Sequence, residues 1–411
     1  MGSARRSRRL RIGALAGLGA LLAAAVVVTA RGGGSLTDPI STADRPAAGF
    51  KTIGYLGHGF AVPTGWRVVD LATDPTACIR FDVHAIYLGT PGTQQDCPAR
   101  GVGRRTGAIL IRPVSSPRGA FVRTVAVDRP ASAEIDATAP GVSITASYGA
   151  DDRSAVVAVL SAAQLPSPVV EPAPDLPAPD VGGLPTGATG VITGVGFDAC
   201  TAPSSDQMSA WTAPASPFTA IGIYIGGSER ACAQPNLTAS WISAESRAGW
   251  RFMPLYVGWQ AAWDSLTQTP PAVLGKQSAD DAVVQAAALG FGPGSVLYYD
   301  MEAYSTAAEG AAAMAFLSAW SAELHLKGYR SAAYSSENSG IADLVANLGK
   351  ITEPDVIDVA NWNGNADADP AATPNGSWTH LRVHQYQGGA DATYGGVRIN
   401  IDRDFFDLHV S

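Results

Sequence analysis

Short apolar runs rich in β-branched and aromatic residues alternate with helical stretches over the second half of the chain. Eight of these runs predict strands: 191–197, 220–225, 251–256, 295–299, 330–334, 356–360, 381–385 and 397–401. Apolar residues at helical spacing predict helices most clearly at 237–247, 279–289 and 307–327. This alternation is typical of βαβ units with parallel strands. Eight such units within residues 190–411 predict an α/β fold, a compact (β/α)8 TIM barrel.

The alternative α/β fold for this region is a doubly wound open sheet. Sheets of that kind that bind dinucleotides carry a Gly-Xaa-Gly-Xaa-Xaa-Gly turn and a helix start after the first strand. Here the first predicted strand ends in Gly-Val-Gly-Phe-Asp at 194–198, without the third glycine or the helix start. The closed barrel is therefore the favoured prediction.

A proline-rich segment at 165–189 divides the chain. Its repeated prolines exclude a helix or a central strand, so it predicts a semi-rigid polyproline II linker. Residues 49–164 hold short β-branched runs separated by Gly and Pro, which predict a small, mostly β domain of unknown role. The 411-residue chain is long enough for this domain and the barrel, 190–411, each to bury a core of its own.

The β domain carries many arginines: Arg100, Arg104, Arg105, Arg112, Arg118 and Arg123. A solvated face is the favoured interpretation of this set, and contact with anionic wall polymers is the alternative. The whole chain has a net charge of −8, which gives no overall electrostatic reason to expect nucleic-acid binding.

The first 30 residues predict an export signal or a membrane anchor. A head with five arginines precedes an uncharged apolar run at 12–30 that ends in small residues. The sequence Ser-Arg-Arg-Leu at 7–10 is similar to a loose twin-arginine signal, and the apolar run is long enough to span a bilayer. We expect export by the Sec or twin-arginine route to the cell surface or beyond, with cleavage or anchoring through 12–30 left open. Residues 31–48 are expected to be a flexible spacer.

The cysteines fit an exported protein. Four cysteines allow three pairings. Pairing within each half requires no bridge between the domains and predicts Cys78–Cys97 and Cys200–Cys232. Because no Cys-Xaa-Xaa-Cys occurs, a zinc ribbon or a thioredoxin-like site is not expected.

The sequence Leu-Tyr-Tyr-Asp-Met-Glu at 297–302 delivers two carboxylates to the end of a predicted strand. Side chains alternate along a strand, so Asp300 and Glu302 face the same side if the extended conformation continues. Two carboxylates that face one space cannot both ionise freely, so we expect one pKa to be raised and the other lowered. A general acid and its charged partner need this asymmetry in glycosidic bond cleavage.

Other strand ends of the predicted barrel carry related side chains. Chemistry in a TIM barrel sits at the C-terminal ends of the strands. Asp198 follows the first predicted strand and Asp402 the eighth, so both could share one mouth with the acid pair. The same ends supply candidates for substrate binding: Trp259, Tyr304, Tyr334, Trp362, Gln385 and Tyr386.

These strand-end motifs resemble those of family 25 glycoside hydrolases, the barrel-shaped muramidases that cut peptidoglycan. The resemblance lies in Gly-Phe-Asp at 196–198, Asp-Met-Glu at 300–302, His-Gln-Tyr at 384–386 and Ile-Asp at 401–402. The chain resembles still more closely the secreted actinobacterial glycoside-hydrolase-like domain, formerly a domain of unknown function, through residues 196–204, 223–227 and 232–238. The resemblance covers the C-terminal domain and none of the N-terminal one.

The resemblance implies a role for each of the four acids. Glu302 is implied as the general acid that protonates the leaving glycosidic oxygen. Asp300 is implied as the ionised partner that stabilises positive charge at the anomeric carbon or assists attack by the substrate's acetamido group. Asp198 and Asp402 are implied to orient and tune this pair. The Cys200–Cys232 bridge and the turn at 201–204 depart from the muramidase pattern and could reshape the cleft.

The expected function is that of an exported, lysozyme-like glycosidase that acts on cell-wall polysaccharide, most simply the β-1,4 bond of peptidoglycan. No cofactor or metal is expected, since His380 and His384 fall about 13 Å apart along a predicted strand. The alternative is a glycan-binding envelope protein with a degenerate or repurposed hydrolase barrel. A peptidase or amidase is disfavoured because no metal set or nucleophile–histidine pair can be assembled. The sequence leaves the oligomeric state unknown.

Overall fold

The computed structural model describes residues 49–114, 124–170, 190–212, 214–263 and 269–410. The predicted export signal or anchor, the spacer at 31–48 and most of the proline-rich linker, 171–189, lie outside these ranges. Within the described ranges, no helix combines the length and the apolar content needed to cross a bilayer.

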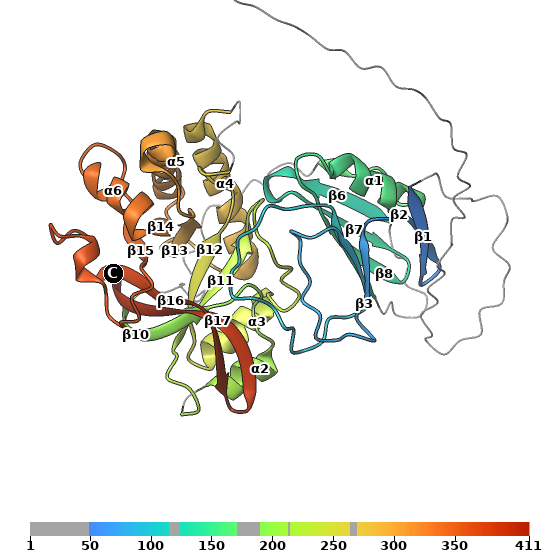
Figure 1. Cartoon of the computed structure of the whole chain (residues 1–411), viewed down its shortest axis with the longest axis horizontal. Helices are drawn as coiled ribbons and strands as arrows, with labels where there is room; N and C mark the ends of the chain where they lie inside the picture. Colours follow the sequence, from blue (N-terminus) through green and yellow to red (C-terminus); the bar gives the residue numbers. More distant parts are fainter. Residues whose placement is uncertain (1–48, 115–123, 171–189, 213, 264–268, 411) are drawn as a thin grey trace, which may run out of the picture.

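The N-terminal part is β-rich, as the sequence predicts, and appears in blue and green in Figure 1. Its described residues form a seven-stranded mixed sheet in the order β3-β4-β5-β8-β7-β6-β9. The strands are β3 (Arg67–Asp70), β4 (Ala85–Leu88), β5 (Ala108–Pro113), β6 (Val125–Arg129), β7 (Glu134–Ala139), β8 (Val142–Ser147) and β9 (Val169–Val170). The hairpin of β1 (Phe50–Tyr55) and β2 (His58–Pro63) and helix α1 (Arg153–Ala162) share a buried apolar cluster with this sheet.

The sheet extends into the segment predicted as linker. Leu165 is buried in the N-terminal core, and β9 pairs with β6 at the edge of the sheet. Prolines are tolerated beside an edge strand because one side of that strand needs no ladder hydrogen bonds. Leu165 and the residues of β9 therefore belong to the N-terminal core and sheet although they fall within the segment predicted as linker.

In the C-terminal part, eight strands of the described ranges close into a barrel in the order β10 to β17. They are β10 (Gly190–Asp198), β11 (Ala220–Gly226), β12 (Arg251–Tyr256), β13 (Val296–Asp300), β14 (Arg330–Ser336), β15 (Val356–Ala360), β16 (Leu381–Tyr394) and β17 (Val397–Val410). The helices are α2 (Ser205–Trp211), α3 (Ala239–Arg247), α4 (Pro271–Leu289), α5 (Thr306–Leu326) and α6 (Ala342–Ala346). The predicted strands all lie within this barrel.

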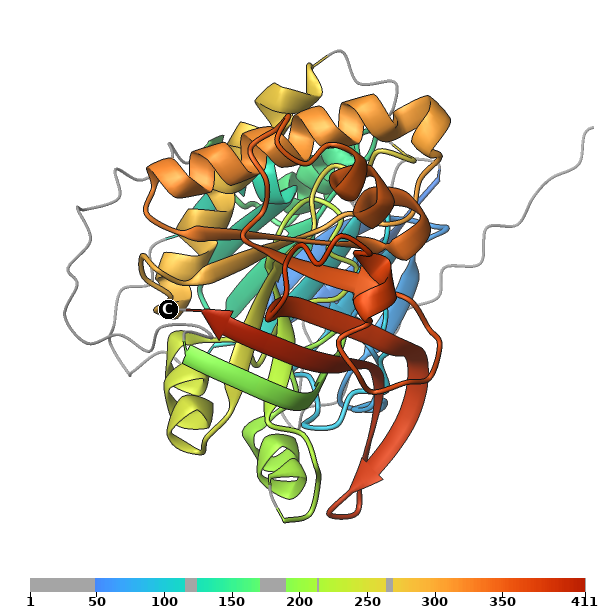
Figure 2. The same ribbon diagram turned by 90° about the vertical axis from the view of Figure 1, so that its left-hand side faces the viewer.

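The regular (β/α)8 arrangement is wrong for the last strand. Neighbouring strands from β10 to β16 run parallel, but β17 runs antiparallel to both β16 and β10. Figure 2 shows β17 in red beside β10 in green. A tight turn at Gly395 and Gly396, both at positive φ, joins β16 to β17. A turn this short can join only antiparallel strands, because a parallel pair needs a crossover of about a dozen residues.

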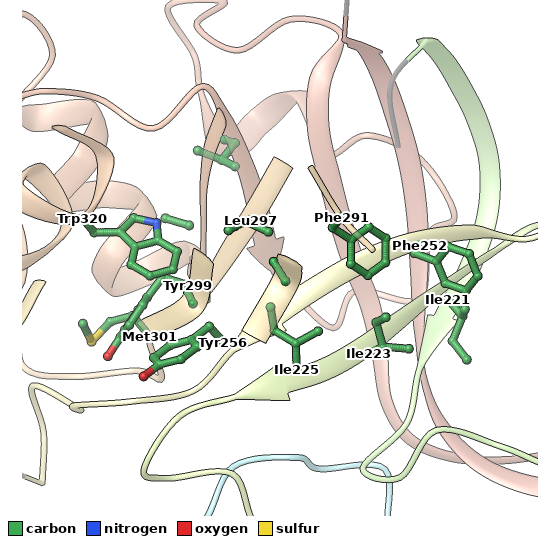
Figure 3. Packing of buried hydrophobic residues seen from close by; sticks show 14 of the residues in the cluster. Ile221, Ile223, Ile225, Phe252, Tyr256, Phe291, Leu297, Tyr299, Met301 and Trp320 are labelled. Carbon is green, nitrogen blue, oxygen red and sulfur yellow. The ribbon is translucent and has the colours of Figure 1, made fainter. Parts of the chain in front are cut away.

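Strand alternation sorts the barrel side chains into two sets. Ile221, Ile223 and Ile225 of β11 belong to the outer apolar cluster, which includes residues of α4 and α5. In Figure 3, Ile225 lies on the side of Tyr256 and Ile221 lies beside Phe252. The intervening positions point into the barrel, where a second apolar cluster fills the interior. That inner cluster includes Ile192, Met253, Val296, Val356 and Leu408.

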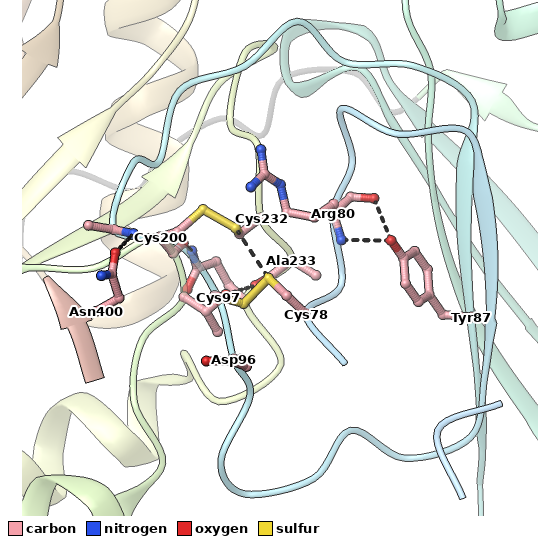
Figure 4. Close-up of a disulfide and its surroundings, with 12 residues drawn as sticks. Cys78, Arg80, Tyr87, Asp96, Cys97, Cys200, Cys232, Ala233 and Asn400 are labelled. Atoms are coloured by element: carbon pink, nitrogen blue, oxygen red, sulfur yellow. Dashed lines mark hydrogen bonds between the residues drawn. A yellow bond between two sulfur atoms is a disulfide. The ribbon is translucent and has the colours of Figure 1, made fainter. Parts of the chain in front are cut away.

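The N-terminal part pairs directly with the loop that follows β11. Residues 79–81 and 101–103 flank residues 230–233, with hydrogen bonds from Phe81 N to Ala231 O (2.6 Å) and from Ala231 N to Gly101 O (2.8 Å). Both expected disulfides, Cys78–Cys97 and Cys200–Cys232, are present. Neither bridge links the two parts, but they lie against each other, with the sulfurs of Cys78 and Cys232 3.8 Å apart (Figure 4).

Candidate active site

A layer of carboxylates lies above the apolar filling of the barrel. The same alternation that directs Val296 and Val356 inward also directs Asp300, two positions along β13 from Tyr298, and Asp358 of β15 inward. Three strands carry acids that the sequence analysis selected: Asp198 on β10, Asp300 on β13 followed by Glu302, and Asp402 on β17.

Asp198 and Asp402 are partners in the sheet. They lie opposite each other in the antiparallel pairing of β10 with β17. The predicted position of Asp402 at the end of a strand is wrong, because β17 continues to Val410. The reversed direction of β17 nevertheless brings its early residues to the rim where β10 ends. This pairing therefore places Asp198 and Asp402 next to each other although they are far apart in sequence.

Asp198 is buried and its carboxylate is held by two neutral donors. Tyr224 Oη donates to Oδ1 (3.0 Å) and Gln385 Nε2 donates to Oδ2 (3.1 Å). Burial raises the pKa of Asp198 well above its ordinary value, and the charges of Asp402 and Asp358 raise it further. Burial also raises the pKa of Asp402 to about 6, although the backbone N–H of Gly389 donates to its Oδ1 at 2.5 Å.

Asp300 and Glu302 differ in exposure. Asp300 is buried and its Oδ1 has no hydrogen-bond partner among the described residues, whereas the Glu302 side chain is 23% exposed. Burial, followed by the charge of Glu302, raises the pKa of Asp300 well above its ordinary value. Burial raises the pKa of Glu302 too, against the lowering effect of Arg100. The expectation that one pKa of this pair is lowered is therefore wrong, because burial acts on both groups.

Gln260 fixes the backbone around the acid pair and was not predicted. Its Nε2 donates to the carbonyl oxygen of Asp300 (2.7 Å), and its Oε1 accepts from the backbone N–H of Glu302 (2.8 Å). A buried amide can serve both groups at once because it carries a donor and an acceptor. No periodicity in the sequence marks this role.

Three of the predicted substrate-binding residues meet beside Asp198. Gln385 donates to Asp198, and its Oε1 accepts from Tyr334 Oη (3.0 Å) and from Trp362 Nε1 (2.9 Å). The Trp362 side chain is 66% exposed, and its ring lies over Gly388, where a Cβ would come within 2.3 Å of it. This side of the rim therefore offers an exposed aromatic face next to a carboxylate.

The other predicted substrate-binding aromatics are used in packing. Trp259 stacks on Phe316 of α5 with ring centroids 5.1 Å apart. Tyr304 is buried in the same outer cluster and donates to Asp343 (2.9 Å). Tyr386 follows the inward-facing Gln385 and is also buried. Trp259 and Tyr304 thus lie in the outer cluster with residues of α5, away from the barrel interior that holds the acids.

Two further acids line the interior and were missed. Asp358 and Asp404 are fully buried, and neither carboxylate has a hydrogen-bond partner among the described residues. Burial raises the pKa of Asp358 to about 8, and it raises that of Asp404 well above the ordinary value. A single acid within an apolar strand, as in Val-Ile-Asp-Val-Ala at 356–360, was the available signal.

Two groups of described residues bring three metal-binding side chains within reach of one another, and neither includes the mouth acids. One consists of the disulfide sulfurs near Cys232. The other is His380, Asp407 and His409, where β16 begins and β17 ends. The two imidazole rings are stacked almost parallel, at 4° and 4.3 Å, so their in-plane nitrogen lone pairs do not converge on one ion.

The N-terminal part adds a cation to the mouth. Arg100 Nε lies 3.4 Å from Glu302 Oε1, and its guanidinium lies over the ring of Trp263, 5.8 Å from the centroid. A solvated face was the favoured interpretation of this arginine, and its contact with Glu302 was not predicted. Arg105 from the same set is buried and pairs with Glu134.

Comparisons with known proteins point to the same region. Residues 209–406 match the family described as Rv2525c-like, glycoside hydrolase-like domain. None of the curated proteins matches the chain.

Solved structures similar to the chain include an uncharacterized B. stearothermophilus protein, at 18% identity and TM-score 0.38 over 52% of this chain and 95% of that one. They also include the modular autolysin LytC from Streptococcus pneumoniae, at 10% identity and TM-score 0.35 over 52% and 46%. A third is the Clostridium perfringens spore cortex lytic enzyme SleM, at 15% identity and TM-score 0.33 over 52% and 67%. At these scores we draw nothing further from them.

Proposed function

Since the chain carries an Rv2525c-like, glycoside hydrolase-like domain, we propose that it is a glycosidase that hydrolyses cell-wall glycan, most simply the β-1,4 bond of peptidoglycan. The observation that carries the proposal is the exposure of Glu302 beside a buried acid. Glu302 can reach a ligand at the rim, while Asp300 lies beneath it and Asp198 and Asp402 pair across the neighbouring strands.

The proposed chemistry is acid catalysis by Glu302. A general acid must hold its proton near the working pH, and burial favours this by raising the pKa of Glu302. Transfer of the Glu302 proton to the leaving oxygen would break its bond to the anomeric carbon, and the positive charge that develops there would favour the ionised form of Asp300. Water would then add to the anomeric carbon and give its proton to a carboxylate of the mouth. Asp198 and Asp402 would tune this pair, and Trp362 would provide a flat face for a sugar ring.

The same proposal places the protein outside the cytoplasm. Two disulfides persist most readily in an oxidising compartment, which agrees with an export signal at 1–30 of either the Sec or the twin-arginine type. We further propose a division into an N-terminal β domain and a C-terminal barrel joined by the segment between β9 and β10.

The test of the acid is Glu302→Gln, which keeps the shape and removes the proton donor. Loss of a general acid lowers turnover by about 100-fold to 10,000-fold. The full chain should clear a peptidoglycan gel and release reducing ends, and the variant should do neither at equal loading. Glu353→Gln is the matched control, because Glu353 precedes β15 at the opposite end of the barrel. Equal clearing by wild type and Glu302→Gln refutes the assignment.

A second candidate function is glycan binding without cleavage. One observation favours it: Arg100 contacts Glu302 and opposes the rise that burial causes in the pKa of the group that must donate a proton. Incubation with defined muropeptides separates the two functions by mass spectrometry. New products indicate hydrolysis, whereas retention of intact ligand with no product indicates a binding protein.

A further inference from the structure

Arg100 comes from the N-terminal part and reaches the mouth of the barrel. Its Nε lies 3.4 Å from Glu302, and its side chain is 60% exposed. Burial raises the pKa of Asp300, Glu302 and Asp402, and the charge of Arg100 opposes that rise in each, so its field covers three carboxylates of the mouth. A guanidinium with this exposure has surface left for a ligand.

The segment around Arg100 is a fixed wall of the barrel mouth. Ala99 N donates to Asn400 Oδ1 of β17 (2.7 Å), two residues before Asp402. Gly101 lies against the ring of Tyr224, where a Cβ would come within 2.2 Å. Val102 is buried in the inner apolar cluster of the barrel. Contacts on both sides of Arg100 thus hold its backbone in place, and only its side chain is free to respond to a ligand.

Charge balance at the mouth defines what that ligand carries. Asp198, Asp300, Glu302 and Asp402 would repel an anionic glycan if all were ionised, but burial raises the pKa of each and so favours their neutral forms. A protonated Glu302 is uncharged, so Arg100 then lacks the counter-charge of that pair. A carboxylate or phosphate on the ligand can replace it, because guanidinium matches both groups with paired N–H donors.

We propose that Arg100 is a specificity-determining residue that the N-terminal domain supplies to the barrel, and that it selects glycans with an anionic group next to the bond at Glu302. The inference rests on the proposed glycan function but not on turnover. It also gives the N-terminal domain a role, since the barrel alone lacks this cation.

The test measures binding and cleavage by the full chain on three preparations of insoluble peptidoglycan. One is untreated, one has its carboxylates converted to amides, and one has its phosphodiester-linked polymers removed with hydrofluoric acid. The variants are Arg100→Ala, Arg100→Lys and the control Arg251→Ala, an exposed arginine at the start of β12, away from the strand ends that carry the acids. Co-sedimentation gives affinity, and released reducing ends give turnover.

The expected result is a loss of affinity of about tenfold or more for untreated peptidoglycan in Arg100→Ala, from loss of a charge-assisted contact. Arg100→Lys should retain part of the affinity, and Arg251→Ala all of it. A loss that disappears on amidated material assigns a carboxylate, and one that disappears after hydrofluoric acid assigns a phosphate. An equal loss on all three preparations, or none on any, overturns the proposal. Thermal midpoints equal to that of wild type exclude misfolding.

Failure of the proposed function has a different signature. If wild type binds all preparations but releases no reducing ends, the hydrolase proposal fails. The dependence of affinity on Arg100 and on ligand charge then still decides the present inference.

Discussion

Glu134, a buried acid where the two parts meet, and the buried barrel acids Asp358 and Asp404 have opposite electrostatic environments. At the contact between the two parts, Glu134 accepts from Arg105 (2.6 Å) and Arg230 (2.7 Å). Burial alone would raise the pKa of Glu134, but these two arginines lower it to about 2. Inside the barrel, Asp358 and Asp404 have no such partners, and burial raises both pKa values.

This difference in pKa distinguishes an acid that stabilises the fold from acids that are suited to proton transfer. Glu134 is ionised and joins β7 to the loop after β11, so its charge helps to hold the two parts together. Burial favours the neutral form of the barrel acids, which can donate a proton and whose ionisation responds to nearby charge. Unpaired buried acids cost stability, and proteins keep them where chemistry requires them.

The largest expected effect comes from removing the paired acid. Glu134→Gln leaves two buried arginines without their counter-ion and should lower the free energy of unfolding by about 3–5 kcal/mol. Asp404→Asn is the matched variant, since an amide resembles a protonated carboxyl, and it should change stability by about 1 kcal/mol or less. Urea denaturation near neutral pH measures both. Equal losses in the free energy of unfolding for Glu134→Gln and Asp404→Asn would contradict the distinction between the paired and the unpaired buried acids.

The pH dependence of stability sharpens the comparison. The pKa of Asp358 is about 8 in the folded protein and about 4 when unfolded, so the folded state binds more protons between these values. Its contribution is therefore complete below pH 4 and lost as pH rises toward 8. Asp358→Asn should flatten this decline by up to about 1.4 kcal/mol per pH unit, or about 2 kcal/mol between pH 6 and 7.5.

Glu134 should give a pH dependence of stability opposite in sign to that of Asp358. Its pKa is about 2, so its contribution is present above pH 4.3 and is lost as pH falls toward 2. Glu134→Gln should consequently lower stability without changing the slope between pH 6 and 7.5. Denaturation at several pH values checks both variants, and an unchanged slope in Asp358→Asn contradicts the raised pKa.

Local patterns predicted the strands well and the last hairpin poorly. The predicted limits of β12 and β15 coincide with the observed ones, because each is a buried apolar run with clear ends. For β16 the sequence predicted a strand only at 381–385, which ends before Gly388 and Gly389. The structure instead carries the strand through irregular pairing there and continues to Tyr394. That continuation depends on pairing with β17 across the tight turn, with Ala390 opposite Ile401 and Tyr394 opposite Val397.

For the site residues too, local patterns were informative and contacts distant in sequence were not predicted. Asp198, Asp300, Glu302 and Asp402 were predicted because each follows a recognisable run. Arg100 and Gln260 were missed because their roles arise from contacts with residues far away in sequence. Trp259 and Tyr304 instead lie in the outer apolar cluster, since position at a strand end does not decide which way a ring points.

The smallest expected effect compares two buried tyrosines of the barrel. Tyr224 donates to Asp198, whereas the hydroxyl of Tyr298 has no partner among the described residues. Tyr224→Phe should lower the free energy of unfolding by about 1 kcal/mol, because a buried acceptor loses its donor. Tyr298→Phe should be neutral or stabilising, because it removes an unsatisfied polar group from the interior. Urea denaturation of both variants at one pH gives the difference between their free energies of unfolding. A larger loss of stability in Tyr298→Phe than in Tyr224→Phe would mean that the Tyr298 hydroxyl makes a stabilising hydrogen bond.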